Sequence, residues 1–141
     1  MTTAQHPKGS NAKVLLTSVF GPFGQDDEYG SRAINPMELY HNQVTREQGP
    51  FSLRMHHRSW GLMLIQENLS ASSTLLDFPD RARFIQEIRI KDYDIVGISG
   101  IIVNVGKVQE LCRLVRLHSP TSTIVVGGHV AAIPGVEQLL D

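Results

Sequence analysis

The chain contains 141 residues, of which 41% are hydrophobic, and this is enough for one globular domain with its own core but not for two. Its 13 basic and 14 acidic residues are scattered through both halves and leave a net charge of -1, which provides no basic surface for nucleic acid or an anionic membrane. The single cysteine excludes disulfides within the chain and multi-thiolate zinc or iron–sulfur sites, and it favours a reducing cytoplasm.

The amino-terminal end, residues 1–12, is mostly polar and lacks the apolar core of a secretory signal. We therefore expect a disordered tail followed by one domain over residues 13–141. No apolar stretch approaches the roughly 20 residues that span a bilayer, which predicts a soluble, cytoplasmic protein. The domain begins with a compact apolar run, residues 13–20, which Gly21-Pro22-Phe23-Gly24 terminates, and this pattern predicts the first strand.

The pattern is less regular in the next fifty or so residues. Residues 25–34 are polar and predict an exposed loop, in which Asp26-Asp27-Glu28 favours a solvated turn over a metal site. Asn35-Pro36 predicts the start of a helix that ends at Gly49-Pro50. Residues 60–65 form an apolar run that periodicity assigns equally to a strand or to a short helix.

A second strand is predicted at residues 73–78, and Pro79 is well placed to open the helix that follows. Phe84, Ile85 and Ile88 share one face of this helix and are expected to enter the core. Its other face is expected to meet water through four charged residues, Arg81, Arg83, Glu87 and Arg89.

Two further strands flank an amphipathic helix. The β-branched runs 93–101 and 122–129 end in glycine or small residues, as buried parallel strands do where a ligand approaches their carboxyl ends. Between them, apolar residues recur at three- and four-residue spacing to about His118, and Pro120 ends the helix. Cys112 lies on the apolar stripe, which predicts a packed and unreactive thiol.

Strands and helices thus alternate along the chain. This order predicts a doubly wound α/β domain of Rossmann-like or flavodoxin-like architecture, with a mostly parallel sheet covered on both faces. After a short helical pattern opened by Pro134 the sequence contains no closing strand and helix. We therefore expect a fragment of a longer polypeptide.

The spacings of the common catalytic and phosphate-binding motifs are not met. Gly100 and Gly106-Lys107 have five residues between them where a phosphate loop has four, and Val108 stands where that loop needs a hydroxyl. Gly97-Ile98-Ser99-Gly100 is one residue out of register for a hydrolase nucleophile elbow. None of the six histidines has a metal-ligand spacing, and only His129 follows a strand at the expected ligand crevice.

The candidate ligand site is the edge at which the last two strands end. It contains Ser99-Gly100-Ile101 and Gly127-Gly128-His129, since the carboxyl ends of parallel strands meet at one edge of a sheet. The serine hydroxyl can bond a ligand, and glycines lack the Cβ atoms that would block a flat ring. A purely structural interpretation also stands, in which the serine bonds nearby backbone and the glycines form a tight turn.

In these residues the chain resembles the cobalamin-binding domain at the amino-terminal end of many radical S-adenosylmethionine enzymes. The resemblance covers nearly all of residues 13–141. It is carried by four segments, Lys13-Val14-Leu15-Leu16, Tyr93 to Ser99, Val115 to Pro120, and Ile124-Val125-Val126-Gly127-Gly128-His129.

The resemblance implies that the nucleotide tail of the corrinoid enters a slot at the carboxyl edge, where Ser99 bonds it, Ile101 lines it and Gly127-Gly128 leave room for it. Phe20, Gly21, Phe23 and Gly24 would then border the corrin. The family's Asp-x-His-x-x-Gly motif is replaced by Val19 to Gly24, so no histidine from this loop would ligate cobalt.

The resemblance also implies a carboxyl-terminal radical S-adenosylmethionine domain in the same polypeptide. That domain needs Cys-x-x-x-Cys-x-x-Cys for a [4Fe-4S] cluster, which this sequence lacks, so the chain alone is expected to catalyse nothing. The intact protein would use cobalamin for methyl transfer or a radical rearrangement or cyclisation. The alternative is a cofactor-free docking module of the same architecture, which exposure of Trp60, Phe20 and Phe23 together would favour.

Overall fold

The computed structural model describes residues 7–20 and 59–139 of the chain. In these residues it contains the strands β1 (Lys13–Thr17), β2 (Ser72–Leu76), β3 (Ile95–Ser99) and β4 (Thr123–Gly127). The strands form one sheet in the order β2-β1-β3-β4, and every neighbouring pair is parallel. The predicted parallel α/β sheet is therefore confirmed. The loop expected at residues 25–34 and the helix expected from Asn35 lie outside the described residues.

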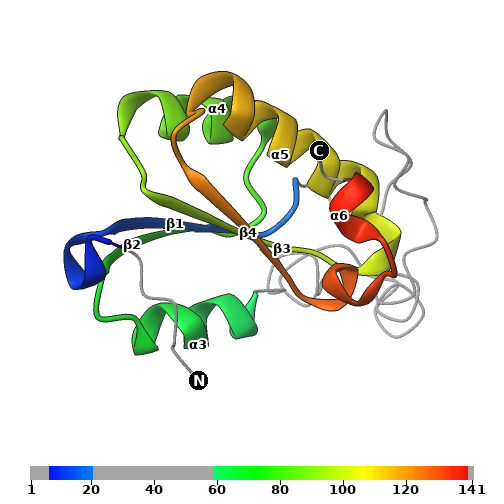
Figure 1. The fold of residues 1–141 in the computed structure, drawn as a ribbon, viewed down its shortest axis with the longest axis horizontal. Coiled ribbons are helices and arrows are strands. Elements are labelled where there is room, and N and C mark those ends of the chain that lie inside the picture. Colours follow the sequence, from blue (N-terminus) through cyan, green and yellow to red (C-terminus); the bar gives the residue numbers. More distant parts are fainter. Residues whose placement is uncertain (1–6, 21–58, 140–141) are drawn as a thin grey trace, which may run out of the picture.

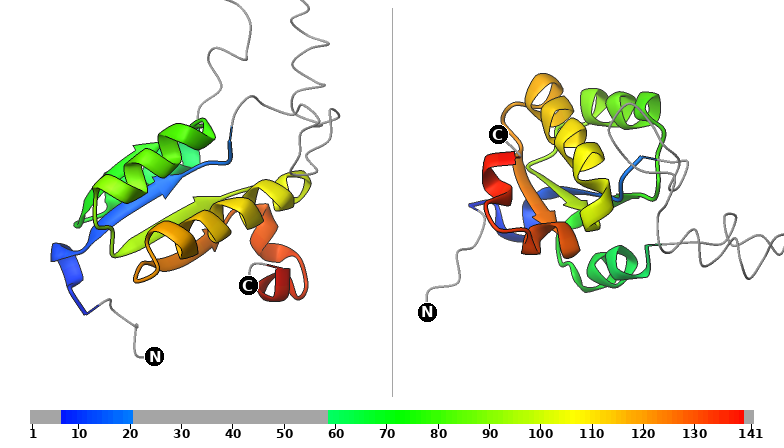
Figure 2. Two further views of the ribbon diagram at one scale, coloured as in Figure 1. Left: turned by 90° about the horizontal axis from the view of Figure 1, so that it is seen from above. Right: turned by 90° about the vertical axis from the view of Figure 1, so that its right-hand side faces the viewer.

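Helices connect the strands and form a layer on each face of the sheet. They are α3 (Trp60–Asn68), α4 (Arg81–Ile90), α5 (Val105–His118) and α6 (Val136–Leu139), with the 3-10 segments η1 (Gly9–Asn11), η2 (Ile102–Asn104) and η3 (His129–Ala132). Figures 1 and 2 show α4 and α5 side by side on one face and α3 on the opposite face. This arrangement confirms the doubly wound fold. None of the helices in the described ranges is long and apolar enough to cross a membrane.

The hydrophobic core has two unequal parts. The larger part lies between the sheet and the helices α4 and α5, and it includes Leu15, Val96, Phe84 and Leu111, each fully buried. A smaller cluster, Val14, Leu16 and Leu62, lies under α3. Because burying one such side chain contributes about 1.5–3 kcal/mol, the α4 and α5 side dominates the stability. The α3 layer packs mainly over β1 and β2, and Ile95 of β3 borders the cluster beneath it.

Local sequence signals explain where the helices begin and end. The Asp80 side chain accepts a hydrogen bond from the Arg83 N–H at 2.7 Å, so Asp80 caps α4 directly after the buried Pro79. The helix α5 ends at His118, as predicted, two residues before Pro120. The ambiguous run at residues 60–65 is helical, and Leu62 is the one residue of α3 that is fully buried.

Three sequence expectations need correction or refinement. Glu87 was expected to face water, but it is buried at 6% exposure because it accepts a hydrogen bond from the Tyr93 hydroxyl and pairs with Lys91. The first strand ends at Thr17 and not at Phe20, although Val19 and Phe20 remain buried. Within the predicted tail, residues 9–11 form η1, and Lys8 pairs with Asp94.

Candidate functional site

The carboxyl ends of β3 and β4 lie beside each other. Ser99 pairs with Gly127 in the parallel register, and the Gly100 N–H donates to the Gly127 carbonyl at 3.2 Å. The Val130 N–H donates in turn to the Gly100 carbonyl at 3.2 Å. The two segments predicted to form the ligand site are therefore directly adjacent.

The two consecutive glycines differ in what surrounds them. A Cβ atom placed on Gly127 would meet nothing within 4 Å. One placed on Gly128 would lie 2.5 Å from the Gly100 carbonyl oxygen, and Gly128 also has φ +79°. Gly128 is therefore required by its backbone conformation and close packing. Of the two glycines, Gly127 is the one whose Cβ position has no described atom near it.

Ser99 lies on the same side of the sheet as Gly127. Its side chain is half-buried, and no residue in the described ranges exchanges a hydrogen bond with its hydroxyl. The interpretation in which Ser99 bonds nearby backbone thus finds no partner there. A hydroxyl that can donate and accept, and that no described residue bonds, can bind a polar ligand group.

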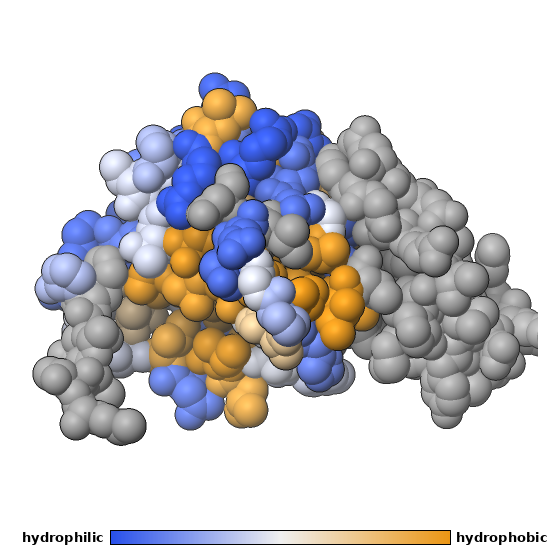
Figure 3. Space-filling view, turned by 45° about the vertical axis from the view of Figure 1, so that its right-hand side comes forward, coloured by the Kyte–Doolittle hydropathy of each residue, from blue (hydrophilic) through white to orange (hydrophobic). Residues whose placement is uncertain are grey.

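On the sheet face that carries α3, the part formed by the carboxyl ends of β3 and β4 has no helix over it among the described elements. The helix α3 covers β1 and β2, whereas Val125 of β4 projects from the same face with half of its side chain, 51%, exposed. Figure 3, which brings the carboxyl edge forward, shows apolar residues across the middle of the surface. Within the described ranges, Val125 thus adds exposed apolar surface near Ser99 and Gly127, which suits a ligand with a flat apolar part.

The remaining predicted site residues are spread around this edge. Gly100 is buried, and a Cβ there would lie 2.6 Å from Val108, so this glycine allows α5 to approach the sheet. Ile101 is half-buried and His129, at the start of η3, is exposed. No group of three or more metal-ligating side chains occurs in residues 7–20 and 59–139.

The loop after β1 was expected to border the corrin ring. Phe20 is buried at 3% exposure, and its ring packs edge-on to Phe84 with 6.0 Å between the ring centroids. Phe20 therefore belongs to the core. The exposed cluster of Phe20 with Trp60 that would favour a docking module does not form. Gly21, Phe23 and Gly24 lie outside the described residues.

Sequence reasoning missed a polar cluster at the ends of β1 and β2. The Ser18 hydroxyl donates to the Asp77 carboxylate at 3.2 Å, which also accepts from the Ser59 N–H at 3.2 Å. The Phe78 N–H donates to the Ser18 hydroxyl, and Phe78 has an unusual φ of +48°. The available signal was that a polar residue follows each strand, at one edge of the sheet. The cluster fixes the start of α3, since Ser59 precedes that helix.

A second residue missed from the sequence is Lys107, in the first turn of α5. It is 2% exposed, and its ammonium donates to the Phe20 carbonyl at 3.1 Å. The signal was a lysine at the positive end of a helix dipole, an unfavourable position unless the charge has a partner. Lys107 thus joins α5 to the end of β1.

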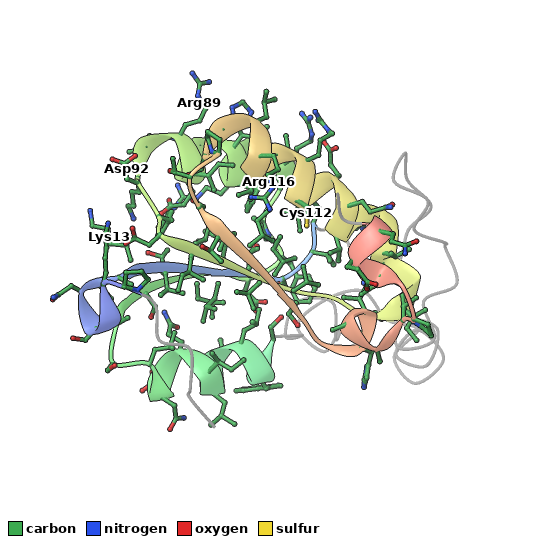
Figure 4. The ribbon with its side chains drawn as sticks, viewed as in Figure 1. Lys13, Arg89, Asp92, Cys112 and Arg116 are labelled. Atoms are coloured by element: carbon green, nitrogen blue, oxygen red, sulfur yellow. The ribbon has the colours of Figure 1, made fainter. Side chains whose placement is uncertain are left out.

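Cys112 has no features of a reactive thiol. It is buried at 1% exposure on the side of α5 that faces the sheet (Figure 4). Desolvation by burial raises the pKa of its thiol to about 11. Since the thiolate is the nucleophile, the prediction of a packed, unreactive cysteine is supported by the geometry.

Comparison with known proteins adds no relative to this description. No protein-family profile, no curated protein and no solved structure matches the chain. The function is therefore inferred from the residues at the carboxyl edge.

Proposed function

We propose that the carboxyl edge of β3 and β4 binds the nucleotide tail of cobalamin, and that the chain is the corrinoid-binding part of a cytoplasmic, B12-dependent radical S-adenosylmethionine enzyme. The observation that carries this proposal is the Ser99 hydroxyl, to which no described residue bonds, on the strand paired with Gly127, where a Cβ would meet no described atom within 4 Å. The two residues are register partners on neighbouring strands, so one ligand group can contact both of them.

The residues present fit the tail of the cofactor. Ser99 offers a donor and an acceptor to a polar group of the nucleotide, and Gly127 leaves room that a Cβ would reduce. Val125 provides apolar surface next to that room. Gly128 contributes indirectly, since its positive φ turns the chain away from the strand end into η3.

The chemistry of the intact protein follows from the cofactor and from a separate domain. A bound corrinoid supplies a cobalt centre for methyl transfer, or for a related radical rearrangement or cyclisation. In this proposal the residues of the chain bind and orient the tail, while the S-adenosylmethionine and the [4Fe-4S] cluster belong to the radical domain. Because the loop after β1 lacks the Asp-x-His-x-x-Gly motif, this proposal assigns no histidine of that loop to cobalt.

Reconstitution with hydroxocobalamin tests the proposal. The purified protein should retain the corrinoid absorption spectrum through gel filtration, and Gly127→Val should abolish that retention while the far-UV circular dichroism stays unchanged. Gly61→Val is the matched control, because it places the same side chain in open space on α3. A wild-type protein that emerges colourless would contradict the proposal.

A cofactor-free docking module is the second candidate. Trp60 and Leu64 lie one turn apart on α3 and are 71% and 67% exposed, which is more apolar surface than one surface helix usually presents. If the protein does not retain the corrinoid, this exposed face becomes the favoured functional surface. The same reconstitution therefore separates the two candidates.

A further inference from the structure

The helix α3 has an apolar surface that its own sheet does not bury. Leu62 is the fully buried residue of this helix, and it packs with residues of β1. Trp60 and Leu64 lie on either side of Leu62 in the sequence, each about 200° around the helix from it, so they point away from the sheet. They are 71% and 67% exposed. Large apolar side chains grouped in this way mark a surface that binds a partner.

The sheet face that carries α3 has room for one more helix. The helix packs mainly over β1 and β2, and two neighbouring strands span about 10 Å, which is the diameter of one helix. The strands β3 and β4 form the other half of this face, and no described helix lies over their carboxyl ends (Figures 1 and 2). Val125 is 51% exposed there. The face thus combines a projecting apolar helix with an uncovered strip of about the same width.

The exposed side of α3 and the uncovered part of β4 lie at the same level along the strands. The Ser59 N–H, just before α3, donates to Asp77, just after β2. The parallel registers across the sheet place Asp77 level with Gly127. Leu64 lies about 7 Å further along α3, a distance of about two strand residues, and α3 runs toward the amino ends of the strands. Leu64 is therefore level with Val125.

Charge does not oppose contact between these two surfaces. The strands β3 and β4 contain no charged residue, and Glu67 is the one charged residue of α3. The whole chain has a net charge of -1, so two copies repel each other only weakly. A strongly acidic or basic partner would find little countercharge on this face. A second copy of the same apolar surface needs none.

We propose that two copies of the chain associate through this face, with α3 of each copy lying over β3 and β4 of the other. A two-fold axis parallel to the strands produces this arrangement, because it exchanges the two halves of the face and keeps each residue at its own level. Leu64 of one copy then contacts Val125 of the other, and the contact occurs twice. Such an interface is closed, so association stops at the dimer.

This inference goes beyond cofactor binding and concerns the protein without a corrinoid. Trp60 of the second copy comes close to the level of Gly127, where a Cβ would meet no described atom within 4 Å. The corrinoid tail and the second copy therefore compete for the same part of the sheet. Association is measured without a corrinoid for this reason, and the result does not depend on whether cobalamin binds.

Sedimentation equilibrium of the full chain over a wide range of concentrations tests the inference. The wild type should form a dimer and no larger species. Leu64→Glu and Val125→Lys should each raise the dissociation constant of the dimer at least about a hundredfold, because each substitution enters the interface twice. Leu117→Glu is the matched control. It makes the same change at a 61% exposed residue of α5, on the opposite face of the sheet, and should leave the dimer intact.

An equimolar mixture of Leu64→Glu and Val125→Lys tests the reciprocal contact. A mixed dimer has one native contact and one Glu–Lys pair, so the mixture should form dimers at concentrations at which each variant alone is a monomer. All three substituted side chains are at least half exposed, and far-UV circular dichroism should match the wild type in every variant. A monomeric wild type, a mixture that stays monomeric, or dissociation of Leu117→Glu would each overturn the inference.

Discussion

The amino and carboxyl ends of β3 and β4 differ in whether their polar groups are hydrogen-bonded. At the amino end, the Ser119 and Ser122 hydroxyls bond each other at 2.7 Å, and Ser122 also donates to the Tyr93 carbonyl at 2.7 Å. The Tyr93 hydroxyl donates to Glu87 at 2.6 Å. At the carboxyl end, the Ser99 hydroxyl has no partner among the described residues.

The difference indicates which polar groups are expected to stabilise the fold and which are available to a ligand. Buried polar groups that bond one another hold the fold together, and removing one leaves another unsatisfied. A polar group without a partner contributes little to folding and remains available to a ligand. The amino end therefore has the pattern of a structural network, and the β3 and β4 side of the carboxyl end has the pattern of a binding edge.

The largest effect on the free energy of unfolding is expected at Gly128, which lies at the carboxyl end but has a structural role. Gly128→Ala should lower the free energy of unfolding by about 2–3 kcal/mol, because it forces a Cβ against the Gly100 carbonyl at a positive φ. Gly127→Ala should change it by less than about 1 kcal/mol. Urea denaturation of both variants measures the difference. Equal losses in the two variants would refute the assignment of separate roles.

A pair of serines tests the two ends directly. Ser122→Ala should cost about 1–2 kcal/mol, because it leaves the Ser119 hydroxyl and the Tyr93 carbonyl without their partner. Ser99→Ala should cost less than about 0.5 kcal/mol, since no described residue bonds that hydroxyl. Chemical denaturation at neutral pH is the measurement. A Ser99→Ala variant as unstable as Ser122→Ala would mean that Ser99 is structural.

The amino-end network should also respond to acid. Hydrogen bonds from Lys91 and Tyr93 lower the pKa of Glu87 in the folded protein. A lowered pKa means that Glu87 contributes stability above the pKa it has when unfolded, and that this contribution is lost as the pH falls through the folded value. The stability difference between wild type and Glu87→Gln should therefore narrow from pH 7 into the acid range. Urea titrations at several pH values test this, and a gap that widens in acid would be inconsistent with it.

The smallest effect is expected for chemical modification of the Cys112 thiol in the native protein. Burial raises the pKa of its thiol to about 11, so iodoacetamide at pH 8 should not modify it in the native protein. Modification in urea should follow the unfolding transition. Rapid labelling without denaturant would show that the core under α5 opens. Comparing the Cys112 labelling rate of Ser122→Ala with that of Ser99→Ala would provide a second test of the difference between the amino and carboxyl ends of the strands.

The fold was largely predictable because it depends on repeating local patterns. Apolar spacing located α5 to its last residue, His118, and the alternation of elements predicted the parallel sheet. The end of the first strand was less clear, because Val19 and Phe20 are as apolar as the strand and are buried without belonging to it. Residues 60–65 were ambiguous for a related reason, since a short apolar run carries no period.

The candidate site was predictable in position but not in detail. Ser99 and Gly127 were placed at one edge because parallel strands end together. Which glycine needs a positive φ could not be seen, because the two are adjacent and neither has a side chain. Glu87 and Lys107 were missed because their partners, Tyr93 and Phe20, come into reach only when the strands and helices pack.

The sequence by itself determined the class of fold and the order of the strands, and it indicated the edge proposed for a ligand, because hydrophobic period and glycine placement are local properties. Only the tertiary structure decided which polar groups are satisfied. It bonded Ser122 to its surroundings, left Ser99 without a partner in the part of the chain that the structure describes, and buried Lys107 against a carbonyl far away in the chain. Hydrogen bonding depends on distances between segments, and these distances exist only after the core has formed.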